Sequence, residues 1–399
     1  MQHVPTLITD LAIILTYAGI FTILFKKLKQ PLVLGYIVAG FLTTPFISFT
    51  PSVADSANVK TWADLGVIFL LFSLGLEFSF KKILKVGSSV IVATSTIILF
   101  MMLAGMLVGA LFGWSRMDCI FLGGMIAMSS TTIIYKAFDD MGLRQKKFAN
   151  TVLGILILED VLAIVLLVML STLAVSNNVE GTEMVLSLGK LLFFLVLCFV
   201  VGIYLIPTFF RLVRGFMSNE ILLVVAISLC FVMVYLASYA GFSPSFGAFI
   251  MGSILAETIE GEKIEHLVTP VKDFFGAVFF VSVGMMVDPL LIQQYWLPIL
   301  VIVLTVVFGQ PFFGTVGVLL SGQPLKTALQ CGFSLTQIGE FSFIIATLGT
   351  TLGVIDSFLY PVVVAVSVIT TFLTPYSIRL ALPFYGWVER KVPAHWLHW

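Results

Sequence analysis

Two adjacent carboxylates, Glu159 and Asp160, lie near the middle of a long apolar segment. A charged side chain at the centre of a bilayer costs about 3 kcal/mol or more, so two in succession need a reason. Adjacent residues on a helix point about 100° apart, and both can therefore reach one water-filled cavity. Carboxylate oxygens are hard ligands that suit alkali cations and protons. Such a site holds either a cation or a proton, and alternating access to it exchanges the two.

The alternative role for this pair is a buried salt bridge that holds a helix bundle together. Apart from Lys136, no basic residue lies at mid-depth in another predicted helix. We therefore favour ion and proton binding over the salt bridge.

Two clusters of polar residues interrupt other apolar segments, one at Met128–Thr132 and one at Ser334–Glu340. The first contains Ser130, Thr131 and Thr132. Small polar residues at bilayer depth mark places where a helix breaks and lines a cavity. Hydrogen bonding between helices by Ser and Thr is the alternative, and for either cluster alone both interpretations stay open.

Two further charged residues accompany these clusters. The N-terminus of a half-helix carries about half a positive charge, so we expect Glu340 to neutralise the helix ends that meet at the second break rather than to bind the ion directly. Lys136 lies one turn after Thr132. It either balances half-helix C-termini or extends to the cytoplasmic surface, and the sequence leaves both roles open.

The elements that position these residues are predicted to be membrane-spanning helices. The chain has 399 residues, of which 59% are hydrophobic and 11% charged, whereas soluble proteins have roughly 45–50% and 25%. This composition excludes a water-soluble fold, and the formal net charge of zero offers nothing to a nucleic-acid partner. Apolar runs predict thirteen helices, near residues 7–25, 32–49, 61–79, 86–112, 117–138, 149–174, 185–213, 220–240, 243–257, 270–287, 295–320, 325–350 and 357–382.

The predicted loops differ in their content of Lys and Arg. One set of alternate loops holds most of these residues, whereas the other holds only Lys60, Arg116 and Lys190. Basic loops stay in the cytoplasm, so we expect the N-terminus outside and the C-terminus inside. Six helices on each side of a seventh also suggest two inverted-topology repeats, helices 1 to 6 and 8 to 13.

Five segments together resemble the monovalent cation:proton antiporter-2 family, which includes glutathione-gated potassium efflux transporters and sodium/proton antiporters. The resemblance covers nearly the whole chain, and the carboxylate pair is its most specific part. The segments are Phe72–Phe78, Met128–Thr132, Glu159–Asp160, Pro270–Met285 and Gln337–Phe341.

The resemblance implies an all-α integral membrane fold of about 13 transmembrane helices, in which the discontinuous helices 5 and 12 cross. Residues 1–399 would form a single transporter membrane domain. Within it, residues 1–85 and 220–289 would form a dimerisation panel, residues 86–174 and 295–382 a mobile core, and residues 185–213 a linker helix. The core would move as an elevator in each subunit of a homodimer.

The resemblance also assigns roles to single residues. Asp160 matches the essential ion-binding carboxylate of the family, and Thr131 and Thr132 match the unwound backbone beside it. Two positions depart from the family. Glu159 stands where Asp, Asn or Gln is usual, and Gln310 stands where many members carry Lys or Arg. Without that cation, Glu159 is either protonated and hydrogen-bonded to Gln310 or is a second ligand of the ion.

The predicted function is therefore exchange of a monovalent cation, K⁺ in preference to Na⁺, for H⁺. We expect no enzymatic activity and no cofactor. The partners would be a second copy, membrane lipid and, in many relatives, a nucleotide-binding regulatory domain. That domain would lie on a separate subunit or on a longer chain, unless this chain acts without one. The expected location is a cell membrane, specifically the bacterial inner membrane.

Two other functions were weighed against antiport. A gated potassium channel needs a continuous pore with a filter, and no filter-like glycine-rich loop is present in the sequence. A sodium-coupled symporter of organic anions needs a basic residue or free half-helix N-termini at its site, whereas Glu159, Asp160 and Glu340 make this cavity acidic.

Overall fold

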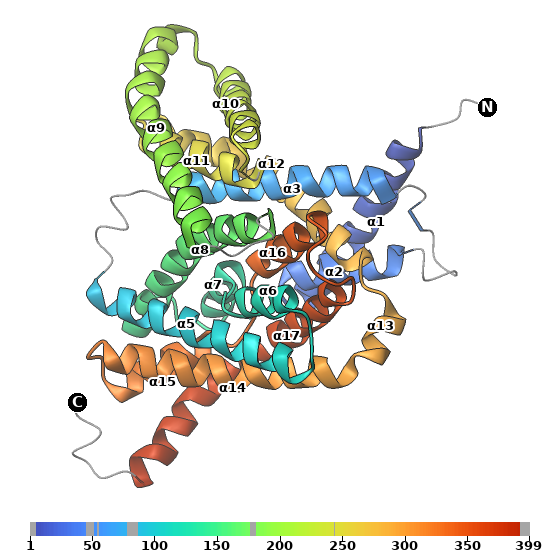
Figure 1. Cartoon of the computed structure of the whole chain (residues 1–399), viewed down its shortest axis with the longest axis vertical. Coiled ribbons are helices and arrows are strands. Elements are labelled where there is room, and N and C mark those ends of the chain that lie inside the picture. The colour runs from blue at the N-terminus through green and yellow to red at the C-terminus, as the bar shows by residue number, and fades with distance from the viewer. Residues whose placement is uncertain are drawn as a thin grey trace. The chain divides into compact units, whose positions relative to one another are not determined.

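The computed structural model describes residues 5–44, 52–53, 56–77, 87–175, 181–242 and 244–391. All regular elements in these ranges are helical. Nine of the described helices are long and apolar enough to cross a membrane. The chain is therefore a multi-pass membrane protein, and Figure 1 shows the order of its helices. They divide into two compact units. Unit 1 comprises residues 1–23, 35–85 and 168–285, and unit 2 comprises residues 24–34, 86–167 and 286–399.

Unit 1 is built around α3, which packs along both α11 and α12. At one close approach, a Cβ added to Gly75 would lie only 2.3 Å from the carbonyl oxygen of Phe249 and 2.9 Å from the Cα of Gly252. Glycine there lets α3 and α11 touch through their backbones. The helices of unit 1 are most of α1 (Thr6–Lys27) and of α2 (Leu32–Thr43), together with α3 (Ser56–Glu77), α9 (Gly181–Val213), the 3₁₀ turn η1 (Arg214–Phe216), α10 (Asn219–Tyr239), α11 (Pro244–Ala256) and α12 (Gly261–Met285).

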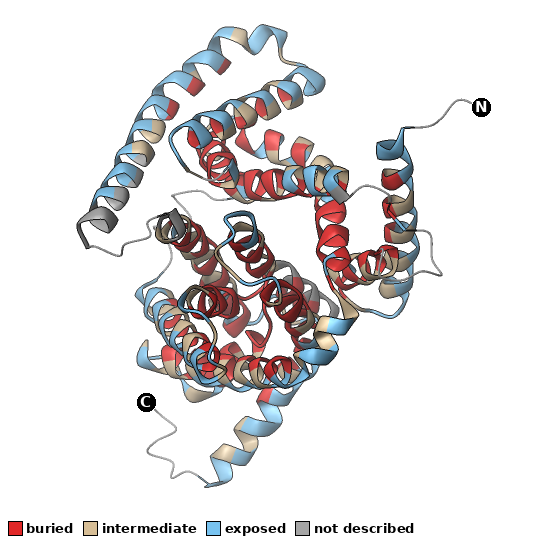
Figure 2. Ribbon diagram, turned by 45° about the vertical axis from the view of Figure 1, so that its right-hand side comes forward, coloured by how far each residue is buried: buried red, intermediate tan, exposed pale blue. Residues whose placement is uncertain are grey.

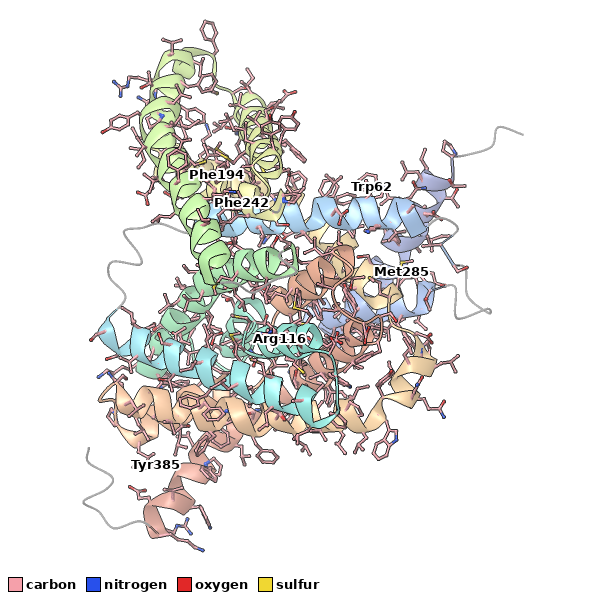
Figure 3. The ribbon with its side chains drawn as sticks, in the orientation of Figure 1. Trp62, Arg116, Phe194, Phe242, Met285 and Tyr385 are labelled. Carbon is pink, nitrogen blue, oxygen red and sulfur yellow. The ribbon has the colours of Figure 1, made fainter. Side chains whose placement is uncertain are left out.

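Aromatic side chains add contacts inside unit 1. Trp62 of α3 stacks on Phe275 of α12 with 5.6 Å between ring centroids, and Phe194 of α9 lies 5.0 Å from Phe242. Trp62, Phe194 and Phe242 are labelled in Figure 3. Such ring pairs contribute about 0.5–1.5 kcal/mol beyond the area they bury.

Unit 2 contains every residue of the predicted site. Short helices α6 and α16 contact each other and are mostly buried, whereas α5 and α14 pack together with exposed apolar faces (Figure 2). A helix that is apolar all round belongs in a protein interior. The helices are α5 (Ser88–Leu111), α6 (Arg116–Ile126), α7 (Thr131–Asp140), α8 (Lys147–Val175, up to residue 167), α13 (Pro289–Gln294), α14 (Trp296–Leu320), α15 (Leu325–Ser334), α16 (Glu340–Thr351) and α17 (Leu359–Lys391).

The predicted helices 5 and 12 are both interrupted. The first consists of α6 and α7, which are separated by residues 127–130, and the second consists of α15 and α16, which are separated by residues 335–339. The second interruption falls inside its predicted polar cluster, and the first begins one residue before its cluster. The total of thirteen helices and the inverted repeat stay predictions, because residues 45–51 and 78–86 lie outside the described ranges.

Four helix boundaries predicted from hydropathy are wrong. Helix α2 ends at Thr43 rather than near 49, and α3 begins at Ser56 rather than near 61. Helix α12 begins at Gly261 rather than at residue 270, because its polar first turns bury Ile264 and Val268 and Pro270 is accommodated inside the helix. Helix α17 continues to Lys391 rather than ending near 382, and it includes Pro375 and Pro383. In the last two cases the helix runs beyond the apolar segment that hydropathy detects.

Units 1 and 2 have bounds similar to those of the predicted panel and core, and α9, the predicted linker helix, belongs to unit 1. Their roles as dimerisation panel and mobile core stay predictions.

Candidate ion-binding site

The first break lies between α6 and α7. Helix α6 ends at Ile126, and α7 begins at Thr131. The hydroxyl of Ser130 accepts a hydrogen bond from the backbone N–H of Ile133 at 3.3 Å, which is the N-cap arrangement of a new helix. Ser130 therefore starts α7 locally, and the break follows from the sequence of the cluster itself.

The second break, residues 335–339, is stabilised from α17. The N–H of Ile338 donates to Thr370 Oγ1 at 3.4 Å, and Ser367 Oγ donates to the carbonyl oxygen of Ile338 at 3.2 Å. An unpaired backbone group at membrane depth costs several kcal/mol, so an interrupted helix needs partners of this kind. The hydroxyls of α17 thus keep this segment unwound.

The two breaks contact each other, and we call this contact the helix crossing. The N–H of Gly339 donates to the carbonyl oxygen of Met128 at 2.9 Å. Gln337 Nε2 donates to the carbonyl oxygen of Ser130 at 3.4 Å, and Ser129 Oγ donates to that of Leu335 at 3.4 Å. A Cβ on Gly339 would lie 2.4 Å from the carbonyl oxygen of Ser129. Only glycine allows the two backbones to approach this closely.

The adjacent carboxylates of α8 both reach the first break. Glu159 is 1% exposed, and its Oε2 accepts a hydrogen bond from the N–H of Ser129 at 3.0 Å. Asp160 is 8% exposed, and its Oδ2 accepts one from Thr131 Oγ1 at 3.0 Å. The pair therefore contacts the two residues that flank Ser130, as the helical angle between neighbours allows.

Glu340 reaches the same break from α16. It is the first residue of that helix, and its Oε2 accepts a hydrogen bond from Ser130 Oγ at 2.7 Å. An acidic side chain in the first turn is favoured by the helix dipole. Three carboxyl groups from two helices thus meet three consecutive residues, the last two of the break and the first of α7.

Of the two alternatives left open for Glu159, the hydrogen bond to Gln310 is not formed in this structure. Gln310 is fully buried in α14, and its Nε2 donates instead to the carbonyl oxygen of Ile126 at 3.2 Å. Glu159 Oε1 and Gln310 Oε1 are both buried without a hydrogen-bond partner among the described residues. The reason is that Ile126 ends α6, so its carbonyl has no partner within the helix and Gln310 satisfies it.

Two predicted site residues are placed only by their backbones. Thr132 and Lys136 lie in α7, and their side chains are outside the part of the chain that the structure describes. Their predicted roles stay predictions.

Sequence reasoning missed the supporting polar groups. Ser129 and Gln337 lie inside the recognised clusters, but their contacts across the helix crossing have no local signal. The hydroxyl residues of α17 do have one, because Ser367, Thr370 and Thr374 recur every three or four residues along an apolar helix and so share one face.

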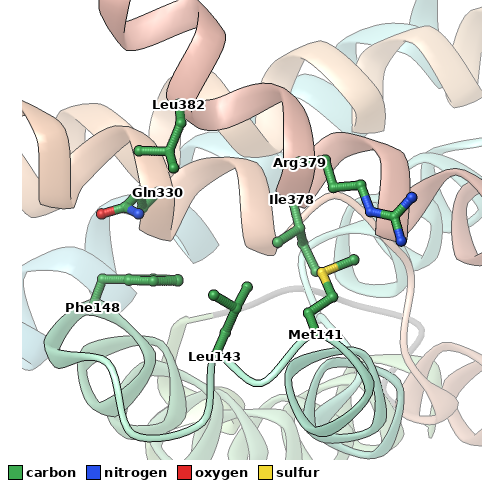
Figure 4. A pocket seen from close by; sticks show the side chains of 7 residues that line it. All are labelled: Met141, Leu143, Phe148, Gln330, Ile378, Arg379 and Leu382. Carbon is green, nitrogen blue, oxygen red and sulfur yellow. The ribbon is translucent and has the colours of Figure 1, made fainter.

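A hollow of about 390 Å³ lies elsewhere in unit 2, where the α7–α8 connection meets α15 and α17 (Figure 4). Its single charged lining residue is Arg379, and its described lining does not include the site residues. The lining residues are Met141, Leu143, Phe148, Gln330, Ile378, Arg379 and Leu382.

Buried carboxylates that contact two crossing, interrupted membrane helices are typical of a class of secondary ion transporters. The family model described as "Sodium/hydrogen exchanger, transmembrane" matches residues 12–382, so the chain belongs to this family. The chain is thus a cation/proton antiporter, and its family consists of transporters rather than enzymes. The resemblance to the cation:proton antiporter-2 family is confirmed.

Several known proteins are similar to this chain. YbaL of Escherichia coli (strain K12), a candidate cation/proton antiporter, is 33% identical over 394 residues, which are 95% of this chain and 69% of that protein. The K(+)/H(+) antiporter subunit KhtU of Bacillus subtilis (strain 168) is 30% identical over 356 residues, which are 88% of this chain and 86% of that protein. The solved structure of the sodium proton antiporter MjNhaP1 from Methanocaldococcus jannaschii has the same fold. Its TM-score is 0.70 at 18% identity, covering 96% of this chain and 98% of that one.

Proposed function

We propose that the chain exchanges one monovalent cation for one proton at Asp160, with K⁺ preferred to Na⁺. The observation that carries this proposal is the hydrogen bond from Thr131 to Asp160 at the break between α6 and α7. This contact joins a carboxylate near the middle of α8 to a hydroxyl beside unwound backbone, and so supports the proposal. These oxygen ligands suit an alkali cation, and a bound proton on Asp160 excludes it.

Glu159 has a different role in this proposal. One of its oxygens accepts from the N–H of Ser129, and the other is buried without a partner among the described residues. An ionised carboxylate there would be a second buried charge beside Asp160, and adjacent like charges disfavour each other's ionisation. Glu159 therefore stays neutral and organises the break, and the exchange is electroneutral.

The preference for K⁺ rests on relatives. KhtU carries K⁺ in its name, as does the K(+) efflux antiporter 4 of Arabidopsis thaliana, which is 32% identical over 381 residues. The contacts of Asp160 suit Na⁺ equally, so ion selectivity is a separate outcome of the experiment below.

Alternating access would follow an elevator mechanism. The residues of the site all come from unit 2, where the break after α6 and the helices α7, α8, α14 and α16 supply them. Unit 2 would thus carry the bound ion as one body, while residues 1–85 and 220–289 hold two copies together as a homodimer.

The proposed location is the bacterial inner membrane, with the N-terminus outside and the C-terminus in the cytoplasm. A nucleotide-binding regulatory domain would act from a separate subunit or a longer chain; KhtU is itself named a subunit.

The test is proton flux in proteoliposomes after addition of K⁺ or Na⁺, read with a pH dye inside the vesicles. The wild type is compared with Asp160→Asn, Glu159→Gln and, as a matched loss of a carboxylate outside the site, Glu220→Gln at the exposed start of α10. We expect cation-dependent flux in the wild type and in Glu220→Gln, none in Asp160→Asn, and retained flux in Glu159→Gln.

Three outcomes would contradict parts of this proposal. Full activity of Asp160→Asn would reduce the carboxylate pair to a structural role. A membrane potential that grows in proportion to flux would exclude one-for-one exchange. Non-saturating cation flux that needs no counter-ion would favour a channel.

A further inference from the structure

An apolar groove of about 1020 Å³ lies on unit 2 between α14, α15 and α17. These three helices pack against one another, as the orange and red ribbons in Figure 1 show. Phe308 and Phe312 of α14 and Leu380 of α17 line the groove and are 68%, 63% and 55% exposed. The volume lies at the upper end of the about 300–1,000 Å³ typical of small-molecule sites.

A row of aromatic rings leads from this groove to a cation. Phe333 of α15 and Phe384 of α17 line the groove, with 5.4 Å between their centroids. Phe384 in turn lies 5.8 Å from Trp387, and Lys391 Nζ lies 4.8 Å from the centroid of Trp387. Residues 380, 384, 387 and 391 recur every three or four positions and so share one face of α17.

A second cation lies at the same end of the groove. Lys326, in the first turn of α15, is exposed, and its Nζ is 5.9 Å from the centroid of Tyr385 (labelled in Figure 3). The Tyr385 hydroxyl donates to Glu389 Oε1 at 3.2 Å, so one acid lies nearby. Arg390 follows on the next residue and is exposed. The end of the groove therefore has an excess of positive charge.

We propose that this groove binds an anionic phospholipid. Its acyl chains fill the apolar part between α14 and α17, and its phosphate lies between Lys326 and Lys391. The argument rests on the combination of features. An apolar groove on a membrane protein faces hydrocarbon, Trp and Tyr mark the level of the headgroups, and basic residues between helices at that level attract anionic headgroups. In the proposed orientation this end of α17 faces the cytoplasmic leaflet.

The test is native mass spectrometry of the purified full chain, titrated in detergent with phosphatidylglycerol or phosphatidylcholine. The variants are Lys326→Gln with Lys391→Gln, and Leu380→Trp, which fills the groove from an exposed position. The matched control is Lys263→Gln, at an exposed basic position of α12 in unit 1.

We expect the wild type and Lys263→Gln to retain phosphatidylglycerol in preference to phosphatidylcholine. The double lysine variant should bind phosphatidylglycerol about 30-fold more weakly, because each basic residue near the headgroup contributes about 1 kcal/mol. Leu380→Trp should lose both lipids. Wild-type lipid retention in these variants would overturn the proposal. So would conversion of a dimer to a monomer by Leu380→Trp without a change in lipid binding, because the groove would then be covered by a second copy.

Discussion

Replacement of Gly339 by alanine tests the helix crossing most directly. The new Cβ would lie 2.4 Å from the carbonyl oxygen of Ser129, 2.6 Å from its carbonyl carbon and 2.9 Å from the backbone nitrogen of Ser130. All three are backbone atoms, so no side chain can rotate away. The two breaks must separate instead.

The required displacement is about 1 Å, because carbon atoms reach favourable contact only near 3.5 Å. Overpacking of this kind costs about 1–3 kcal/mol. It also stretches the hydrogen bond from the Gly339 N–H to Met128, now 2.9 Å, and shifts Glu340 away from Ser130. A misplacement of 1 Å in a reactive site can cost about 100-fold in rate, so we expect transport to fall much further than stability.

The assay combines thermal unfolding of the purified protein in detergent with proton flux in proteoliposomes. Gly19→Ala is the matched control, because the added Cβ has nothing within 4 Å and alanine is favoured in a helix by about 1 kcal/mol. Gly339→Ala should melt at a lower temperature than the wild type and transport about 100-fold more slowly, whereas Gly19→Ala should do neither. If both variants behaved alike, the close approach of the two breaks would be refuted.

Two further substitutions test the ion-binding site and the connection between α16 and α17. Thr131→Val removes the hydroxyl that donates to Asp160 at 3.0 Å. Because a hydrogen bond to a charged group contributes about 1.5–3 kcal/mol, half-saturation of transport should need at least about 10-fold more cation. Thr131→Ser keeps the hydroxyl and should show wild-type values in the same flux titration. In the α16–α17 connection, the negative charge of Asp118, with a smaller contribution from burial, raises the pKa of Asp356 above its usual range, while the Asp356 N–H donates to Asp118 at 2.8 Å. A raised carboxyl pKa destabilises the folded state as pH rises through it, so Asp356→Asn should melt above the wild type at neutral pH, and the difference should vanish below about pH 4. A constant difference across that pH range would exclude the charge repulsion as its cause.

Much of this protein could be predicted from local sequence. The membrane class, the buried position of Glu159 and Asp160 and the two interruptions all follow from the cost of placing polar groups in hydrocarbon. That cost depends on a residue and its immediate neighbours, so single segments reveal it. For the same reason, hydropathy alone ended α17 too early and began α12 too late, since their additional turns are polar but still helical.

The tertiary structure alone decided which groups meet. Ser129 binds Glu159, Thr131 binds Asp160 and Ser130 binds Glu340 across sequence separations of 30, 29 and 210 residues. Contact with Glu159 was one of the alternatives open to Gln310, but its side chain satisfies the end of α6. These pairings depend on how closely two broken helices approach. The need for glycine at position 339 becomes visible only when the partner backbone is seen opposite it. The sequence of one segment is enough to show that burying a polar group there costs free energy. The group that hydrogen-bonds to it and offsets this cost comes from a distant segment, so only the tertiary structure identifies it.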